Sequence, residues 1–70
     1  MATEKELSDF LQSVEKRAFK RSLYHVRNEE SALDIVQDSM LALTARYRDR
    51  PAAEWGPLFQ TIYIEAYLRS

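Results

Sequence analysis

Residues 31–47 carry the clearest alternation of apolar and polar positions. Their apolar residues recur at steps of three and four, which predicts an amphipathic helix with one buried face. These core positions are Ala32, Ile35, Val36, Met40, Leu43 and Tyr47. A second stripe, on another side of the same helix, comprises Asp34, Gln37, Asp38 and Leu41. Folding requires only the first stripe, so the second is a candidate partner-binding face.

Apolar spacing also predicts a helix upstream of this one. Its core positions run from Leu7 to Val26, and its start is expected near Leu7. Thr3 and Ser8 are both candidate N-caps, and Glu6 stands three residues after Thr3, as a capping box requires. The first helix is therefore predicted to occupy most of the chain before Asn28.

Asn28 is a favourable N-cap for the central helix, which leaves a link of only two or three residues between the two helices. So short a link favours an antiparallel hairpin. The central helix is expected to run to about Arg48, because the residue before Pro51 is restrained from helical geometry.

Residues 49–57 are predicted to form the one substantial loop, with a helical turn at residues 52–55. A third helix is expected from Pro57, which suits a first helical turn. This helix is apolar on nearly every side, so it requires neighbours on several sides, either a second copy or the rest of a larger protein. The fold class predicted is all-α: an antiparallel helix hairpin with a third helix packed across it.

Length and composition narrow the function classes. Seventy residues make one small domain, spanning residues 1–70, which buries only about 60% of its unfolded surface. The chain has no cysteine, no signal peptide and no apolar run of the ~20 residues that span a membrane, so a cytoplasmic setting is expected. Its net charge of −1 differs from the basic excess of most DNA-binding domains.

No catalytic constellation is evident. His25 is the only histidine, and a serine nucleophile would need a positioned base. Asp34 and Asp38 are spaced to share a cation, but two carboxylates are a weak metal signal. We therefore expect neither an enzyme nor a cofactor or metal site.

A basic patch on the first helix leaves two interpretations open. It comprises Lys16, Arg17, Lys20 and Arg21. These cations either form a solvated face that pairs with nearby acids or face a phosphate backbone.

The central helix resembles a known motif. Ala32-x-Asp34-Ile35-Val36-Gln37-Asp38, followed by Met40-Leu41, is similar to the core-binding motif in region two of bacterial RNA polymerase sigma factors. The closest likeness is to the extracytoplasmic-function group, which typically carries Asp-Ala-x-Asp-Leu-Val-Gln-Glu-x-Phe. Ser31 stands in place of the first acid, and Asp38 in place of the Glu. The resemblance covers roughly residues 8–62.

The resemblance implies a partner for the second stripe. Region two of these factors is helical and docks on the clamp helices of the largest subunit of core RNA polymerase. Such a dock combines polar groups that pair with arginines and apolar contacts. By this resemblance the polymerase-binding residues are Asp34, Gln37, Asp38 and Leu41. The alternative is a solvated helix face with Leu41 as an ordinary exposed residue.

The resemblance also implies promoter DNA as a partner in the full protein. In the family, the loop and the helix that follows it open the −10 element and capture flipped bases of one strand. The residues that match this role interleave cations with aromatics. They are Arg46, Tyr47, Arg48, Arg50 and Trp55. The alternatives are a core position for Trp55 and a charged helix end for the arginines.

After Phe59-Gln60 the chain departs from the family. Where the family has a basic helix, this chain has Thr61-Ile62-Tyr63-Ile64-Glu65-Ala66-Tyr67-Leu68. The family's second DNA-binding domain is also absent, so we expect a fragment or a divergent relative. An anti-sigma factor is a further candidate partner. The apolar third helix favours an alternative function: a self-associating helical interaction module without DNA binding, which forms a homodimer through that helix.

Overall fold

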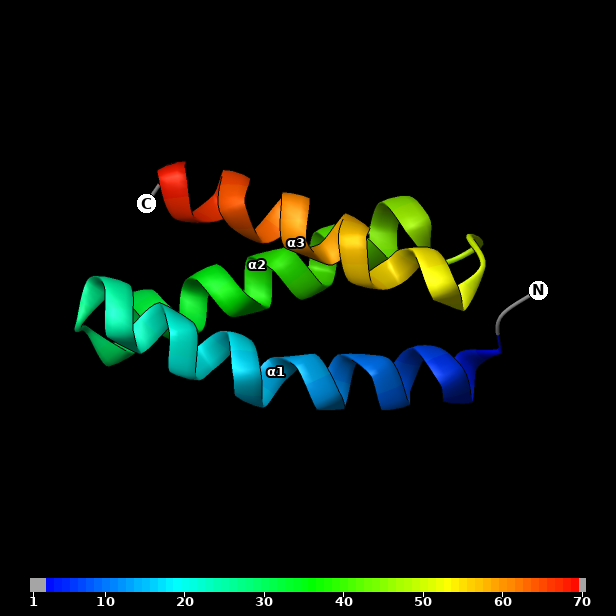
Figure 1. The fold of residues 1–70 in the computed structure, drawn as a ribbon, viewed down its shortest axis with the longest axis horizontal. Coiled ribbons are helices and arrows are strands. Elements are labelled where there is room, and N and C mark those ends of the chain that lie inside the picture. The colour runs from blue at the N-terminus through cyan, green and yellow to red at the C-terminus, as the bar shows by residue number, and fades with distance from the viewer. Residues whose placement is uncertain (1–2, 70) are drawn as a thin grey trace.

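The computed structural model describes residues 3–69, which form three helices and no strand. They are α1 (Glu4–Val26), α2 (Glu29–Tyr47) and α3 (Ala52–Arg69). Successive helices run antiparallel, so that α2 returns along α1 and α3 returns along α2 (Figure 1). The predicted all-α, three-helix fold is confirmed. None of these helices combines the length and apolar composition that crossing a bilayer requires.

[FIG1] 

The first helix starts from a capping box. The Glu6 N–H donates to the Thr3 hydroxyl at 3.1 Å, and the Thr3 N–H donates to the Glu6 carboxylate at 3.0 Å. Thr3 rather than Ser8 is therefore the N-cap, and α1 begins three residues before the predicted Leu7. At its other end Arg27 adopts the left-handed conformation (φ 53°) and donates its N–H to the Leu23 carbonyl.

The second helix begins as predicted at Asn28. Its side-chain oxygen accepts the Ser31 N–H at 3.0 Å, and Glu29 and Glu30 occupy the first turn, where the helix dipole favours acids. Only Arg27 and Asn28 separate α1 from α2, so the predicted antiparallel hairpin is confirmed.

The third helix begins at Ala52, and the predicted start at Pro57 is wrong by five residues. The expected turn at residues 52–55 is continuous with the rest of α3, and the Glu54 N–H already donates to the Pro51 carbonyl at 2.9 Å. Pro57 lies inside the helix. Its missing N–H leaves the Ala53 carbonyl without the usual donor four residues on.

The core forms where α2 meets both neighbours. Of the predicted core positions on α2, four are buried and two, Met40 and Tyr47, are half-buried. The four buried ones are Ala32, Ile35, Val36 and Leu43. From α3, Trp55, Phe59 and Ile62 complete the cluster. The apolar stripe therefore has the structural role that its periodicity predicts.

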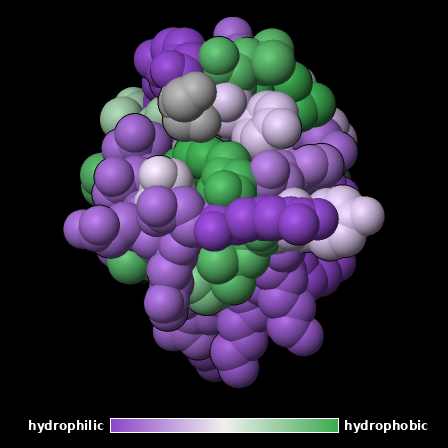
Figure 2. All heavy atoms as spheres, turned by 90° about the vertical axis from the view of Figure 1, so that its left-hand side faces the viewer, coloured by the Kyte–Doolittle hydropathy of each residue, from purple (hydrophilic) through white to green (hydrophobic). Residues whose placement is uncertain are grey.

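The packing is uneven, because α2 contacts both other helices extensively while α1 and α3 contact each other little. The molecule is elongated, about 37 × 19 × 15 Å, because its three helices of 18 to 23 residues lie side by side. On the outer side of α3, Ile64 and Leu68 are 46% and 74% exposed. Figure 2 views the end of the bundle where α1 and α3 end: hydrophilic side chains cover most of this face, with a smaller hydrophobic area among them.

Candidate functional site

The second stripe of α2 lies on the surface. Asp34, Gln37 and Asp38 are exposed, and Leu41 has 69% of its surface accessible. At about 100° per residue these positions face away from the buried Ala32–Val36–Leu43 side of the helix. The structure thus brings the four predicted polymerase-binding residues onto one outward face.

This face takes no part in holding the described chain together. Within residues 3–69, no hydrogen bond or ion pair joins the side chains of Asp34, Gln37 or Asp38 to another residue. Two carboxylates and an amide therefore keep their full hydrogen-bonding capacity for an external partner. Leu41 adds an apolar contact at the C-terminal end of the stripe, and the combination suits a partner that presents arginines beside an apolar surface.

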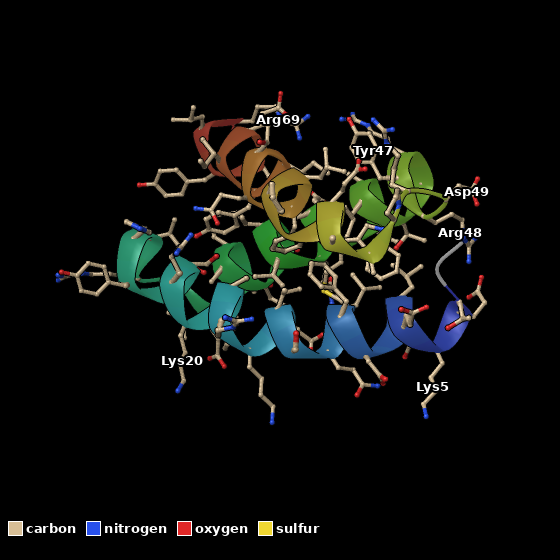
Figure 3. The ribbon with its side chains drawn as sticks, turned by 45° about the vertical axis from the view of Figure 1, so that its right-hand side comes forward. Lys5, Lys20, Tyr47, Arg48, Asp49 and Arg69 are labelled. Atoms are coloured by element: carbon tan, nitrogen blue, oxygen red, sulfur yellow. The ribbon has the colours of Figure 1, made fainter. Side chains whose placement is uncertain are left out.

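The cations predicted to contact DNA gather where α2 ends. Arg46, Arg48 and Arg50 are all exposed (Figure 3 labels Arg48). Two of them are engaged: Arg48 pairs with Glu4 at the start of α1, and Arg50 lies 3.6 Å from the Glu54 carboxylate. Local acids thus partly neutralise this cluster, which lowers its attraction for phosphate.

Trp55 does not join these arginines on the surface. It is 1% exposed, its indole N–H donates to the Tyr47 carbonyl at 3.1 Å, and its ring centroid lies 5.5 Å from that of Phe10. The expectation that Trp55 stacks on a DNA base is corrected: in this fold it is a core residue that fixes the α2–α3 connection. Tyr47 is half-buried beside it.

The basic patch of α1 divides into two parts. Arg17 and Arg21, four residues apart, line a groove toward α3. Lys16 and Lys20 are exposed outside that groove, and Lys20 points away from the other helices (Figure 3). The sequence contained the signal for this division, because Arg17 and Arg21 continue the spacing of Phe10 and Val14 on the same side of the helix.

His25 contacts aromatic rings rather than a catalytic group. Its ring centroid lies 5.7 Å from Tyr24 and 5.1 Å from Tyr67. In the part of the chain that the structure describes, no three potential metal ligands come together, and Asp34 and Asp38 stand without a third.

Comparisons of this chain with protein-family models, curated proteins and solved structures give no match. The resemblance to sigma-factor region two therefore stays a prediction that depends on the motif around Asp34. What the fold adds is the position of that motif: an exposed face on a helix whose other side is fully committed to the core.

Proposed function

We propose that this chain is a sigma-factor-type domain that docks on the clamp helices of core RNA polymerase through α2. The observation that carries the proposal is the outward face of Asp34, Gln37, Asp38 and Leu41, which carries the motif of the resemblance and has no partner within the described chain. Arginines of the clamp helices would pair with the two carboxylates, and Leu41 would be buried in the contact.

The experiment compares two double variants of the same chemistry. Asp34→Lys/Gln37→Ala alters the proposed face, and Asp9→Lys/Gln12→Ala makes the same changes, at the same spacing, on the outer side of α1. All four residues are exposed, so both variants should keep the helical circular dichroism and lose no more than about 0.5 kcal/mol of unfolding free energy.

Binding is measured by capture of purified core polymerase on the immobilised chain. We expect the α2 variant to weaken capture at least tenfold, because reversed charge would face clamp arginines, while the α1 variant binds like the natural sequence. Equal capture by both variants would refute the docking face.

The same proposal includes a contribution to recognition and melting of the −10 promoter element in a longer protein. The residues available for it are Arg46, Arg48 and Arg50, without the buried Trp55. A titration with single-stranded −10-like DNA tests this part: binding should weaken as salt rises, and Arg46→Gln/Arg50→Gln should reduce the salt slope. Binding that depends neither on salt nor on these two substitutions would exclude a DNA-contacting role for the arginines.

A second candidate function is self-association through α3. The observation that favours it is the exposure of Ile64 and Leu68 on one outward side of that helix. Sedimentation would report a dimer that Ile64→Glu/Leu68→Glu converts to a monomer. A chain that remains monomeric across the concentration range would exclude this function and leave docking as the candidate.

A further inference from the structure

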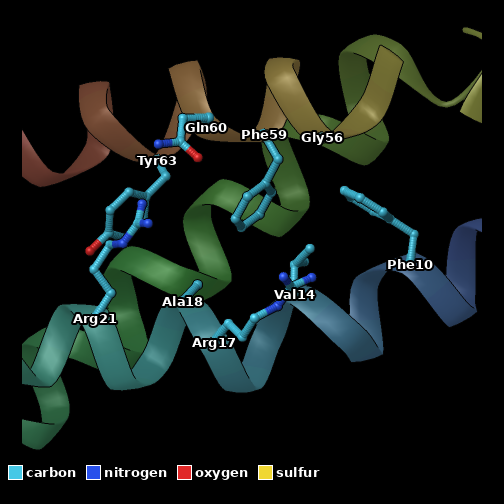
Figure 4. Close-up of a pocket in the computed structure, with 9 residues that line it drawn as sticks. All are labelled: Phe10, Val14, Arg17, Ala18, Arg21, Gly56, Phe59, Gln60 and Tyr63. Carbon is cyan, nitrogen blue, oxygen red and sulfur yellow. The ribbon is translucent and has the colours of Figure 1, made fainter. Parts of the chain in front are cut away.

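A groove of about 280 Å³ runs between α1 and α3, lined by residues 10–21 of α1 and residues 56–63 of α3. It exists because both helices pack on α2 but hardly on each other. Figure 4 shows side chains from both walls directed into this space. None of the groove residues belongs to α2, so the α1/α3 groove shares no residue with the proposed docking face.

The groove is apolar at one end. Phe10 and Val14 from α1 face Phe59 from α3, and the Phe10 and Phe59 rings meet edge to face with centroids 6.3 Å apart. Rings in this arrangement provide the edges and faces on which another aromatic ring packs well.

The other end is basic. Arg17 and Arg21 both reach into the groove from α1, and the Arg21 guanidinium lies 5.8 Å from the centre of the Tyr63 ring, which holds it at the groove wall (Figure 4). In residues 3–69 neither arginine has a carboxylate within ion-pair distance, and no acid lines the groove. Two uncompensated guanidinium groups beside an apolar surface attract an anion.

Gly56 is one of the residues that line the groove. It is the only glycine of the chain and lies within α3, where a Cβ atom would meet nothing within 4 Å. A side chain at this position would project toward the groove without a steric clash. The position therefore allows the groove to be filled while the helix is preserved.

We propose that the α1/α3 groove binds a small aromatic anion, one ring system that carries a carboxylate or phosphate. The ring packs against Phe10 and Phe59, and the acidic group binds Arg17 and Arg21. Ligand pockets for larger molecules measure roughly 300–1,000 Å³, so a groove at the lower limit suits a ligand of this size. The proposal is independent of polymerase docking, because the two sites have no residue in common.

The experiment titrates the ¹⁵N-labelled chain with adenosine monophosphate and, separately, with indole-3-acetate, and follows the amide signal of Gly56, which no other glycine can obscure. Adenosine and indole, which lack the acidic group, are the matched neutral ligands. The site is supported if either anion gives saturable shifts with a dissociation constant at least tenfold lower than that of its neutral counterpart. The anion that binds more tightly shows whether the natural ligand is a nucleotide or an aromatic acid. No saturation with either anion, or equal binding of the neutral ligands, overturns it.

Variants locate the binding. Arg17→Gln/Arg21→Gln should raise the dissociation constant at least tenfold. Lys16→Gln/Lys20→Gln removes the same charge from outside the groove and should change the dissociation constant by no more than twofold. Gly56→Leu should abolish binding and keep the helical circular dichroism. Because this variant lacks the glycine signal, its binding is measured by saturation transfer from the protein to the ligand. An equal effect of the lysine pair, or undiminished binding to Gly56→Leu, would refute the groove as the site.

Discussion

Replacement of Trp55 by alanine should unfold a large fraction of this domain. The side chain is 1% exposed, bonds to the last residue of α2 and packs against the Phe10 ring of α1. Truncation of a buried tryptophan to alanine costs about 3–5 kcal/mol. At ~0.05–0.15 kcal/mol per residue, a chain of 70 residues has a total unfolding free energy of about 3.5–10 kcal/mol. One substitution therefore removes from about a third of the unfolding free energy to all of it.

The assay is urea unfolding followed by circular dichroism, because Trp55 is the only tryptophan and its fluorescence is lost with the residue. A small domain loses about 1 kcal/mol of unfolding free energy per molar urea, so the midpoint should fall by roughly 3–5 M. Trp55→Phe keeps an aromatic ring but loses the N–H bond to Tyr47, and it should lose about 1–2 kcal/mol.

Tyr24→Ala is the matched control, since this ring is 77% exposed and its removal should change the unfolding free energy by no more than about 0.5 kcal/mol. If Trp55→Ala were as mild as Tyr24→Ala, the ring would not be a core residue. The arguments from burial would then fail, and Trp55 would again be a candidate for contact with DNA.

Three further substitutions test the local structure, each by urea unfolding. Thr3→Ala should lose about 0.5–2 kcal/mol with its capping box, and no loss would mean that α1 frays at this end. Tyr63→Phe should lose about 1–3 kcal/mol of unfolding free energy, because the fully buried Ser22 hydroxyl donates to the Tyr63 oxygen at 3.1 Å. Adding Ser22→Ala should recover part of this loss, because no buried hydroxyl is then left without its partner. Strictly additive losses from the two substitutions would contradict the hydrogen bond. Arg27→Gly should gain about 0.5–1 kcal/mol by relieving a left-handed non-glycine residue, and a loss would contradict that strain.

The helix boundaries that depend on local signals could be predicted from the sequence. Asn28 caps α2 as predicted, and Thr3, one of the two candidate caps of α1, forms the capping box that its spacing to Glu6 allows. Spacing did not exclude Ser8 or the later start near Leu7, which the structure corrects. The central helix was predictable for a related reason: its apolar period of three and four leaves one arrangement in which those residues are buried.

The start of α3 was not predictable in this way. Proline at position 57 suggested a first turn, yet Ala52, Ala53 and Glu54 are strong helix formers, and the buried indole of Trp55 anchors them to the end of α2. That anchor depends on a contact between residues eight apart on different helices, which periodicity does not encode. Tertiary packing thus outweighed the one backbone hydrogen bond that Pro57 removes.

In the candidate site, too, features set by local periodicity could be predicted, and features set by contacts between distant helices could not. Exposure of the Asp34 stripe followed from the period of the core, because residues opposite a buried face must lie outside. The pairing of Arg48 with Glu4 and the burial of Trp55 did not follow, since each depends on how distant helices meet. Helical spacing places Arg17 and Arg21 on the side of Phe10 and Val14, but the groove that these two arginines line depends on the position of α3.

Folding and the proposed docking can be separated on α2, because the proposed docking face lies on the side of the helix opposite the core. The core side is surrounded by α1 and α3, so a change at Val36 or Leu43, both fully buried, reduces stability and with it every activity. The outward side carries Leu41 at 69% exposure. Leu41→Ser should therefore leave the urea midpoint unchanged and weaken polymerase capture. A loss of more than about 0.5 kcal/mol of unfolding free energy would show that this leucine stabilises the fold instead.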